Sequence, residues 1–165
     1  PAAPDQLAFS DGVMTWGGTV TTPTTTTLAT GGTALLGVRS FDMEISNGLD
    51  DNEPTLGSGL YASRAAVIEG KEFCKGSFER EYLDRSLIDD VITQTPRPVT
   101  WTFTGRGPST TAPFLLQLFA PAVVLSSPAS VEPNDAKVIT QKHDFTVLQP
   151  ATGAPLYAVL RTTEA

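Results

Sequence analysis

Residues 35–48 read LLGVRSFDMEISNG, and this stretch decides the expected fold class. From residue 41 the side chains alternate strictly, with Phe41, Met43 and Ile45 on one face and Asp42, Glu44 and Ser46 on the other. Such alternation is typical of a β-strand with one buried and one solvated face. Asn47 and Gly48 tolerate positive φ and end the pattern. We therefore expect a strand over residues 35–45.

Other stretches also carry strand patterns, in residues 71–81, 99–103, 114–125, 138–148 and 156–162. In the first of them, two phenylalanines lie at opposite parity across Gly76, which predicts a bulge there. The long apolar stretch is interrupted at Pro121. The last two stretches are expected to pair as a closing hairpin around residues 151–155. Abundant threonine, glycine and proline favour the same all-β class.

One helix is predicted over residues 84–93, from Asp84 to Thr93. Asp84 can cap its start, and an apolar stripe recurs at helical spacing in Leu87, Ile88, Val91 and Ile92. Asp89 and Asp90 are expected on the solvated side. Two prolines within residues 95–98 stop the helix because proline cannot continue its hydrogen bonds. The sequence therefore predicts a mainly β subunit, a sandwich or barrel-like fold whose single helix covers one edge or an open end.

Two stretches do not match one element. Residues 19–33 are rich in threonine with one proline and a Gly-Gly pair, typical of a strand edge or an extended linker. Residues 50–70 form a long inter-strand loop, which is uncommon in a compact domain unless it binds something. Apolar side chains on such a loop predict a contact that a partner covers. The expected subunit-interface residues of this assembly loop are Leu49, Leu56, Leu60, Tyr61, Val67 and Ile68.

The composition indicates a single acidic globular domain over residues 1–165, with 40% hydrophobic and 18% charged residues. Its formal net charge of −7 disfavours binding of nucleic acid through a basic face. No apolar run approaches the ~20 residues that span a bilayer and no signal peptide is apparent, so no membrane partner is expected. Because the chain begins at Pro1 rather than Met, an additional upstream N-terminal portion is expected.

Motifs for cofactors and metals are weak. Gly57-Ser58-Gly59 lacks the third glycine and the strand-to-helix context of a dinucleotide loop. Residues 50–53 offer carboxylate oxygens to calcium, but Pro54 falls where a third alternate ligand belongs, which favours a solvated acidic turn. We therefore expect no cofactor and no metal.

The lone histidine and the lone cysteine give no catalytic arrangement. His143 has no second His or Cys nearby to share a metal, and its neighbour Asp144 points to the opposite face of a strand. Cys74 lies mid-strand and is interpreted as a packing residue. With one cysteine, an internal disulfide framework is excluded. No catalytic residue is assigned, and the chain is not expected to be an enzyme.

Several motifs follow one another in a defined order. They are GVRSFD and SNGL at 37–42 and 46–49, VIEGKE and GSFERE at 67–72 and 76–81, an apolar strand at 118–125, Q-x-x-D-F-T-x-L at 141–148, and a final hairpin at 155–163. Together these segments resemble siphophage tail tube (major tail) proteins. The resemblance covers residues 38–163, although KEFC at 71–74 departs from the family's more usual Arg and Val.

The resemblance implies a β-sandwich subunit with a flanking helix that closes into hexameric rings. Stacked rings would form the tail tube that conducts DNA during ejection, in a virion assembled in the host cytoplasm. The implied partners are further copies and the terminator, distal tail and tape measure proteins. DNA would be only a non-specifically passing cargo, since a negative wall does not hold phosphates as a basic one would.

Two pairs of carboxylates are candidates for that wall. Asp42 and Glu44 share the face opposite the apolar alternation, and Glu79 and Glu81 share a face of their own strand. A solvated outer face is an equally open interpretation of each. The alternative function is a decoration or adhesin-like binding module of a virion or cell surface. That function predicts an aromatic groove or exposed tip site, whereas the Trp and Tyr residues are scattered along the chain.

Overall fold

The computed structural model describes residues 9–46, 74–105, 114–126, 130–132 and 139–161. Within them the chain is mainly β with a single α-helix, as the sequence predicted. A short 3-10 helix η1 (Phe9–Asp11) comes first, and the α-helix is α1 (Ser86–Thr93). The strands are β1 (Gly12–Trp16), β2 (Val38–Ile45), β3 (Cys74–Glu81), β4 (Arg97–Thr104), β5 (Leu115–Leu125), β6 (Ser130–Glu132), β7 (Thr140–Val147) and β8 (Tyr157–Arg161).

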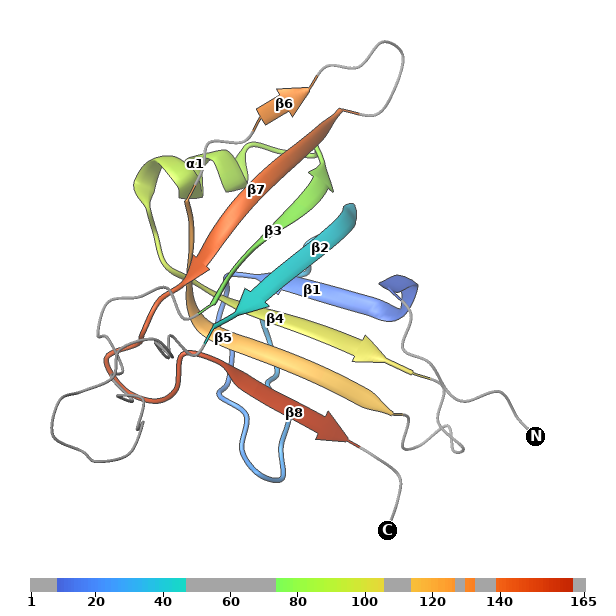
Figure 1. The fold of residues 1–165 in the computed structure, drawn as a ribbon, viewed down its shortest axis with the longest axis vertical. Helices are drawn as coiled ribbons and strands as arrows, with labels where there is room; N and C mark the ends of the chain where they lie inside the picture. The colour runs from blue at the N-terminus through green and yellow to red at the C-terminus, as the bar shows by residue number, and fades with distance from the viewer. Residues whose placement is uncertain (1–8, 47–73, 106–113, 127–129, 133–138, 162–165) are drawn as a thin grey trace, which may run out of the picture.

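The long strand β5 joins two layers of antiparallel strands (Figure 1). Its residues 115–119 lie between β4 and β8, and β1 pairs with the far side of β4. Its residues 123–125 pair with β7, which leads through β3 to β2, while β6 pairs with the start of β7. The β4–β5 register shifts around Pro121, where the sequence predicted an interruption. Strand β5 therefore changes layers at that shift.

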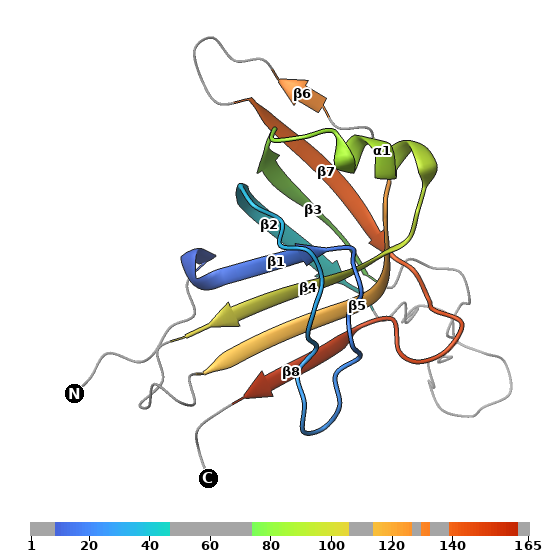
Figure 2. The ribbon, with the colours of Figure 1, turned by 180° about the vertical axis from the view of Figure 1, so that it is seen from behind.

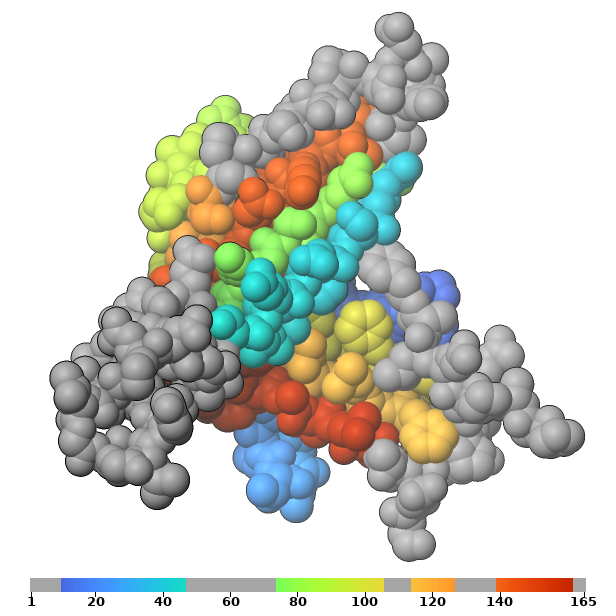
Figure 3. All heavy atoms as spheres, viewed as in Figure 1, coloured from blue at the N-terminus to red at the C-terminus, as the bar shows by residue number. Residues whose placement is uncertain are grey.

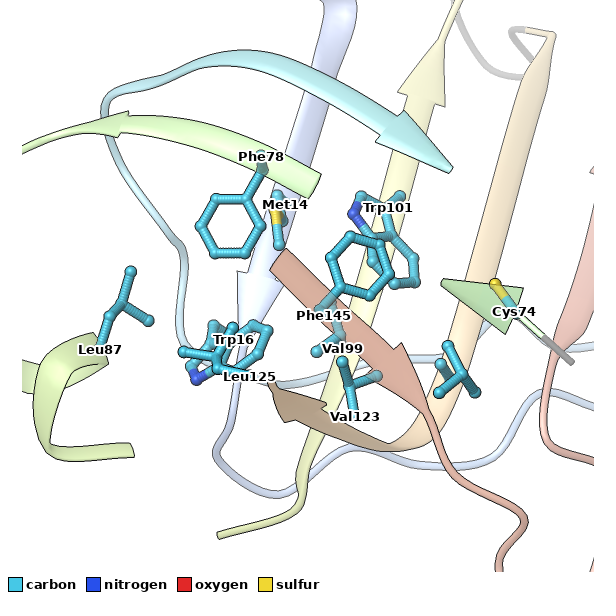
Figure 4. Close-up of a cluster of buried hydrophobic side chains, with 12 residues drawn as sticks. Met14, Trp16, Cys74, Phe78, Leu87, Val99, Trp101, Val123, Leu125 and Phe145 are labelled. Carbon is cyan, nitrogen blue, oxygen red and sulfur yellow. The ribbon is translucent and has the colours of Figure 1, made fainter. Parts of the chain in front are cut away.

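The hydrophobic core lies between the two layers (Figure 4). Trp101 of β4 packs against Phe41 of β2 and Phe145 of β7, with ring centroids 5.3 and 5.7 Å apart. The apolar face predicted from the alternation at residues 41–45 thus meets the opposite layer. Only its last member, Ile45, is exposed, because it lies at the end of β2.

Helix α1 packs Leu87 into this core, with Val91 partly buried beside it, whereas Ile92 of the predicted stripe is exposed. Asp90 was wrongly expected in solvent: it is only 7% exposed. Its Oδ2 accepts a hydrogen bond from Trp16 Nε1 at 2.8 Å, and its Oδ1 accepts two from Arg97, the shorter at 2.7 Å. A carboxylate can be buried when it is paired in this way. Asp90 therefore fastens α1 to both β1 and β4.

Strands β7 and β8 do not form the predicted closing hairpin. In the described strands, β7 pairs with β3, β6 and the end of β5, whereas β8 pairs with the start of β5. Residues 148–156 therefore carry the chain from one layer to the other. The prediction was wrong because local alternation marks a strand without identifying its partner.

The bulge predicted at Gly76 is also absent from the described strand β3. Gly76 pairs in regular register with Met43 on one side and Phe145 on the other. A Cβ at this position would lie 2.7 Å from the Phe145 ring, so glycine is needed for close approach instead. The irregularity in this layer lies in β2, between Val38 and Ser40. Strand β2 begins at Val38, later than expected, because Gly37 before it turns the chain with a φ of 76°.

Residues 19–33, which we call the threonine arm, form a hairpin-like excursion between β1 and β2 rather than a linker (Figure 2). Thr21 and Thr30 pair across it, with 2.9 Å between the Thr21 nitrogen and the Thr30 oxygen, and Thr24 and Thr27 close its tip. Gly31 has a φ of 97°, and a Cβ there would lie 2.2 Å from the Thr19 oxygen. The glycine pair therefore permits the return of the arm.

Candidate assembly surface

The four carboxylates predicted for a tube wall lie on one face of the molecule. Strands β2 and β3 pair so that Asp42 opposes Ser77, Glu44 opposes Lys75 and Glu79 opposes Ser40. Paired residues of antiparallel strands point to the same side, and Glu81 follows Glu79 on that side. The intervening residues Phe78 and Arg80 are buried toward the core. We call the outward side of the β2–β3–β7 layer the open face, and Figure 3 shows its three strands side by side.

Cations missed by the sequence analysis partly offset this negative charge. Lys75 Nζ lies 3.7 Å from a carboxylate oxygen of Glu44, and Arg39 Nη2 lies 2.7 Å from one of Glu81. Lys142 of β7 is the register partner of Glu79. The sequence showed on which side of its own strand each of these cations lies. It did not show the strand pairing that brings the cations close to the carboxylates. The open face therefore carries mixed charge rather than a purely negative band.

Asp42 lies in the most acidic part of the open face. Its neighbour across β3 is Ser77, and Ser77 in turn pairs with Asp144 of β7. Both Asp42 and Asp144 are exposed. A row across the three strands thus runs from carboxylate through hydroxyl to carboxylate. Lys75 and Lys142 lie in the adjacent rows.

The opposite outward side, which belongs to the β1–β4–β5–β8 layer, is buried in its middle, and we call it the covered face. Thr100, Gln117 and Phe119 point to this side, yet all three are buried. The Gln117 amide forms two hydrogen bonds to the backbone of Ala29 in the threonine arm, donating to its oxygen at 3.0 Å and accepting from its nitrogen at 2.7 Å. Figure 2 shows the arm crossing this layer. The arm therefore covers the middle of this face, while Val13 of β1 stays exposed on it.

The residues considered for catalysis lie in the interior. His143 is fully buried against Phe78, with Asp144 on the opposite side of β7, as predicted. Burial, with the charge of Arg80 adding to it, lowers the pKa of His143 to about 4, so the ring is neutral near pH 7. Burial also raises the pKa of the Cys74 thiol to about 11, which confirms it as a packing residue rather than a reactive thiolate.

The described part of the chain holds neither a metal-ligand cluster nor a membrane-spanning helix. Among the described residues no three His, Cys, Asp or Glu side chains gather as metal ligands. No helix of the described ranges has the length and apolar character needed to cross a bilayer. The glycine motif at residues 57–59, the acidic run at 50–53 and the six apolar residues of the assembly loop lie outside the described residues.

The sequence model of one family, described as phage tail tube protein, matches residues 4–147. The chain belongs to the phage tail tube protein family. No match was found among the curated proteins. The family match includes β1 to β7, the threonine arm and α1, and it ends before β8.

Membership makes the chain a structural component of a phage tail, which assembles with itself and with other tail proteins. This agrees with the expectation from the ordered motifs, and it favours a structural role over a catalytic one. The buried Asp90 and the clamp from Gln117 to Ala29 were not found from the sequence. Trp16 lies 74 residues from Asp90 and Ala29 lies 88 residues from Gln117, so no local pattern could have indicated these two contacts.

Proposed function

We propose that this tail tube protein closes into hexameric rings, and that stacked rings form the tube of a siphophage tail through which DNA passes during ejection. The observation that carries the proposal is the contrast between the two outward faces. The middle of the covered face is buried by the threonine arm through Gln117, whereas the open face keeps Asp42 and Glu44 exposed. A bore for DNA needs a solvated, weakly adhesive wall, and the open face has that chemistry.

The electrostatics of the open face suit passage rather than retention. DNA binds proteins chiefly through phosphate contacts with Lys and Arg, which release counterions. On the open face Lys75 and Arg39 are each paired with a glutamate, Lys142 is opposite Glu79, and Asp42 adds further negative charge. A passing duplex would therefore meet few cations able to hold it. We assign Asp42, Glu44, Glu79 and Glu81 to the wall of the bore.

The remaining contacts of the tube are proposed from the sequence. The assembly loop, with Leu49, Leu56, Leu60, Tyr61, Val67 and Ile68, would contact a neighbouring copy. The ends of the tube would meet terminator and distal tail proteins, and the tape measure protein would occupy the bore before DNA does. Assembly would take place in the host cytoplasm. Negative-stain microscopy of the purified protein tests the proposed self-assembly directly. Rings or tubes of uniform bore are expected, and lone monomers would contradict the proposal.

Charge reversal on the open face tests the assignment of the bore. Replacing Asp42 and Glu44 with Lys in every copy would place a ring of cations along the DNA path. Tubes should still assemble because both side chains are exposed, while DNA delivery slows, most severely at low salt, because each new phosphate contact adds salt-dependent affinity. Delivery is measured as DNA release from particles at two salt concentrations.

The control introduces the same number of lysines elsewhere. Thr22→Lys with Thr25→Lys places two lysines at exposed positions of the threonine arm, away from the open face. This control should deliver DNA at the normal rate. Normal delivery by the variant with Asp42→Lys and Glu44→Lys would place the open face outside the bore.

A further inference from the structure

Three polar side chains are buried together on the inner side of β3 and β7, at the end of this layer near α1 (Figure 1). Arg80 is 3% exposed, and Gln141 and His143 are fully buried. Arg80 is the register partner of Gln141, and His143 is the partner of Phe78, the neighbouring inward residue of β3. Because paired residues of antiparallel strands point to the same side, the three polar side chains are neighbours in the interior.

These residues carry most of the buried polar side-chain atoms that lack a partner. Arg80 Nε and Nη1, Gln141 Nε2 and His143 Nδ1 have no hydrogen-bond partner, and among the described residues the only other such atom is Trp101 Nε1. A buried polar atom without a partner costs free energy, and folded proteins satisfy nearly all of them. Their concentration on three neighbouring side chains indicates a shared partner.

The hydrogen bonds within this group define which roles are left open. Arg80 Nη2 donates to Asp84 Oδ2 at 2.8 Å, so Nε and Nη1 remain as donors. His143 Nε2 lies 3.3 Å from Gln141 Oε1. Because an amide oxygen can only accept, Nε2 carries the ring proton, and Nδ1 of the neutral ring is an acceptor. The group therefore offers donors on Arg80 and Gln141 together with one acceptor on His143.

This mixture of donors and an acceptor discriminates between ligands. A carboxylate or a halide ion accepts hydrogen bonds from Arg80 and Gln141, but it cannot donate one to His143 Nδ1. A metal cation is repelled by the guanidinium charge of Arg80. A water molecule both accepts and donates, so it matches all the open roles. Buried waters typically form about three hydrogen bonds with polar groups that are otherwise unsatisfied.

We propose that Arg80, Gln141 and His143 form an internal hydration site, in which bound water accepts from Arg80 and Gln141 and donates to His143 Nδ1. The site is linked to the start of α1, because Arg80 binds Asp84 and Asp84 Oδ1 accepts a hydrogen bond from the Ser86 backbone nitrogen at 2.8 Å. It belongs to the folded subunit, and it therefore does not depend on the proposed tube.

Nuclear magnetic resonance of the unaltered protein at neutral pH tests the site without any substitution. The carbon-bound ring protons of His143 should show cross-peaks to water with the sign of a long-lived contact, and the ring nitrogen shifts should show a protonated Nε2. The ring protons of Phe145, which is buried on the same side of β7, are the control and should show no such cross-peak. Absence of the water cross-peak at His143, or a protonated Nδ1, would overturn the inference.

A chloride titration separates bound water from a bound anion. The His143 ring shifts should stay constant from chloride-free buffer to high chloride, because water and not an anion occupies the site. A saturable shift would show that an anion binds there, and it would overturn the inference.

A variant with an apolar group in place of the site provides an independent measurement. Arg80→Met with Gln141→Leu and His143→Phe removes all the open donors and the acceptor. Oxygen-17 relaxation dispersion should then lose the amplitude of at least one long-lived water, whereas the control Thr146→Val, on the outward side of β7, should keep the full amplitude. Equal amplitudes in the triple variant and the unaltered protein would overturn the inference. If the triple variant does not fold, the resonance measurement on the unaltered protein still decides.

Discussion

The two outward faces of this sandwich differ in how far the rest of the chain covers them. On the covered face, Gln117 clamps the threonine arm, and Phe119 is 2% exposed although it points away from the core. On the open face, Asp42 and Glu44 remain in solvent. The strands of both layers alternate between inward and outward side chains in the same way. The difference in burial between the two outward faces therefore arises from the threonine arm.

This difference separates residues that fold the subunit from residues that serve the assembly. A face buried by the protein's own chain contributes free energy to folding through the apolar area removed from water. A face of exposed, partly paired charges contributes little to folding. The following substitutions test that separation, beginning with the largest expected effect.

Truncation on the covered face should cost the most stability. Phe119→Ala removes a buried ring that lies 5.8 Å from Tyr157, and should lower the free energy of unfolding by about 3–5 kcal/mol. Ser40→Ala, at an exposed outward position of β2, should change it by less than about 0.5 kcal/mol. Urea unfolding of both variants measures the contrast. Equal effects would mean that the arm does not bury the middle of the covered face.

Acidification should lower the free energy of unfolding through His143, which is buried beneath the open face. The folded-state pKa of His143, about 4, lies below its usual 6.5, so the unfolded chain binds the proton first as the pH falls. Stability is therefore complete above pH 6.5 and declines toward pH 4, by about 3 kcal/mol in total. His143→Leu should remove this part of the pH dependence, as measured by unfolding at successive pH values. Parallel pH profiles for the two proteins would contradict a buried, neutral His143.

Loss of the arm's clamp should have an intermediate effect. Gln117→Ala leaves the backbone nitrogen and oxygen of Ala29 without their partner, which should cost about 1–3 kcal/mol. Hydrogen exchange locates the change, because the Ala29 amide should lose its protection. The Gly17 amide, bonded to the Pro98 oxygen outside the arm at 2.8 Å, is the internal control and should stay protected. An Ala29 amide that remains slow to exchange would show that the arm is held by other contacts.

Neutralising the open face should barely affect folding. Glu44→Gln breaks only a solvent-exposed ion pair with Lys75, at 3.7 Å, and should change the free energy of unfolding by less than about 0.5 kcal/mol. Chemical denaturation measures the free energy of unfolding of this variant and of Phe119→Ala under the same conditions. A loss above about 1 kcal/mol would mean that the open face contributes to subunit stability after all.

The sequence predicted those features that depend on local alternation. The pattern of residues 41–45 predicted β2 and its two faces, and the apolar spacing predicted α1 with Leu87 buried. Alternation also brought Asp42 and Glu44 to one side, because side-chain direction in a strand has a period of two. The lumen assignment of that side remains a prediction.

Features that depend on distant partners escaped prediction. Asp90 was expected in solvent because its partners Trp16 and Arg97 belong to other strands. Strand β8 was predicted to pair with β7, but it pairs with β5. The same local alternation is compatible with either partner. The few apolar residues of the threonine arm, Val20, Leu28 and Ala29, show no regular alternation, so its anchoring through Gln117 had no hydrophobic signal. Each of these depends on pairing across the sandwich.

A cryo-electron microscopy reconstruction of assembled tubes tests the central claim most directly. The account predicts that the outward strands β2, β3 and β7 line the bore, with Asp42 and Glu44 facing the DNA path and the threonine arm on the outer side. A reconstruction in which the threonine arm or the covered face lines the bore would contradict it.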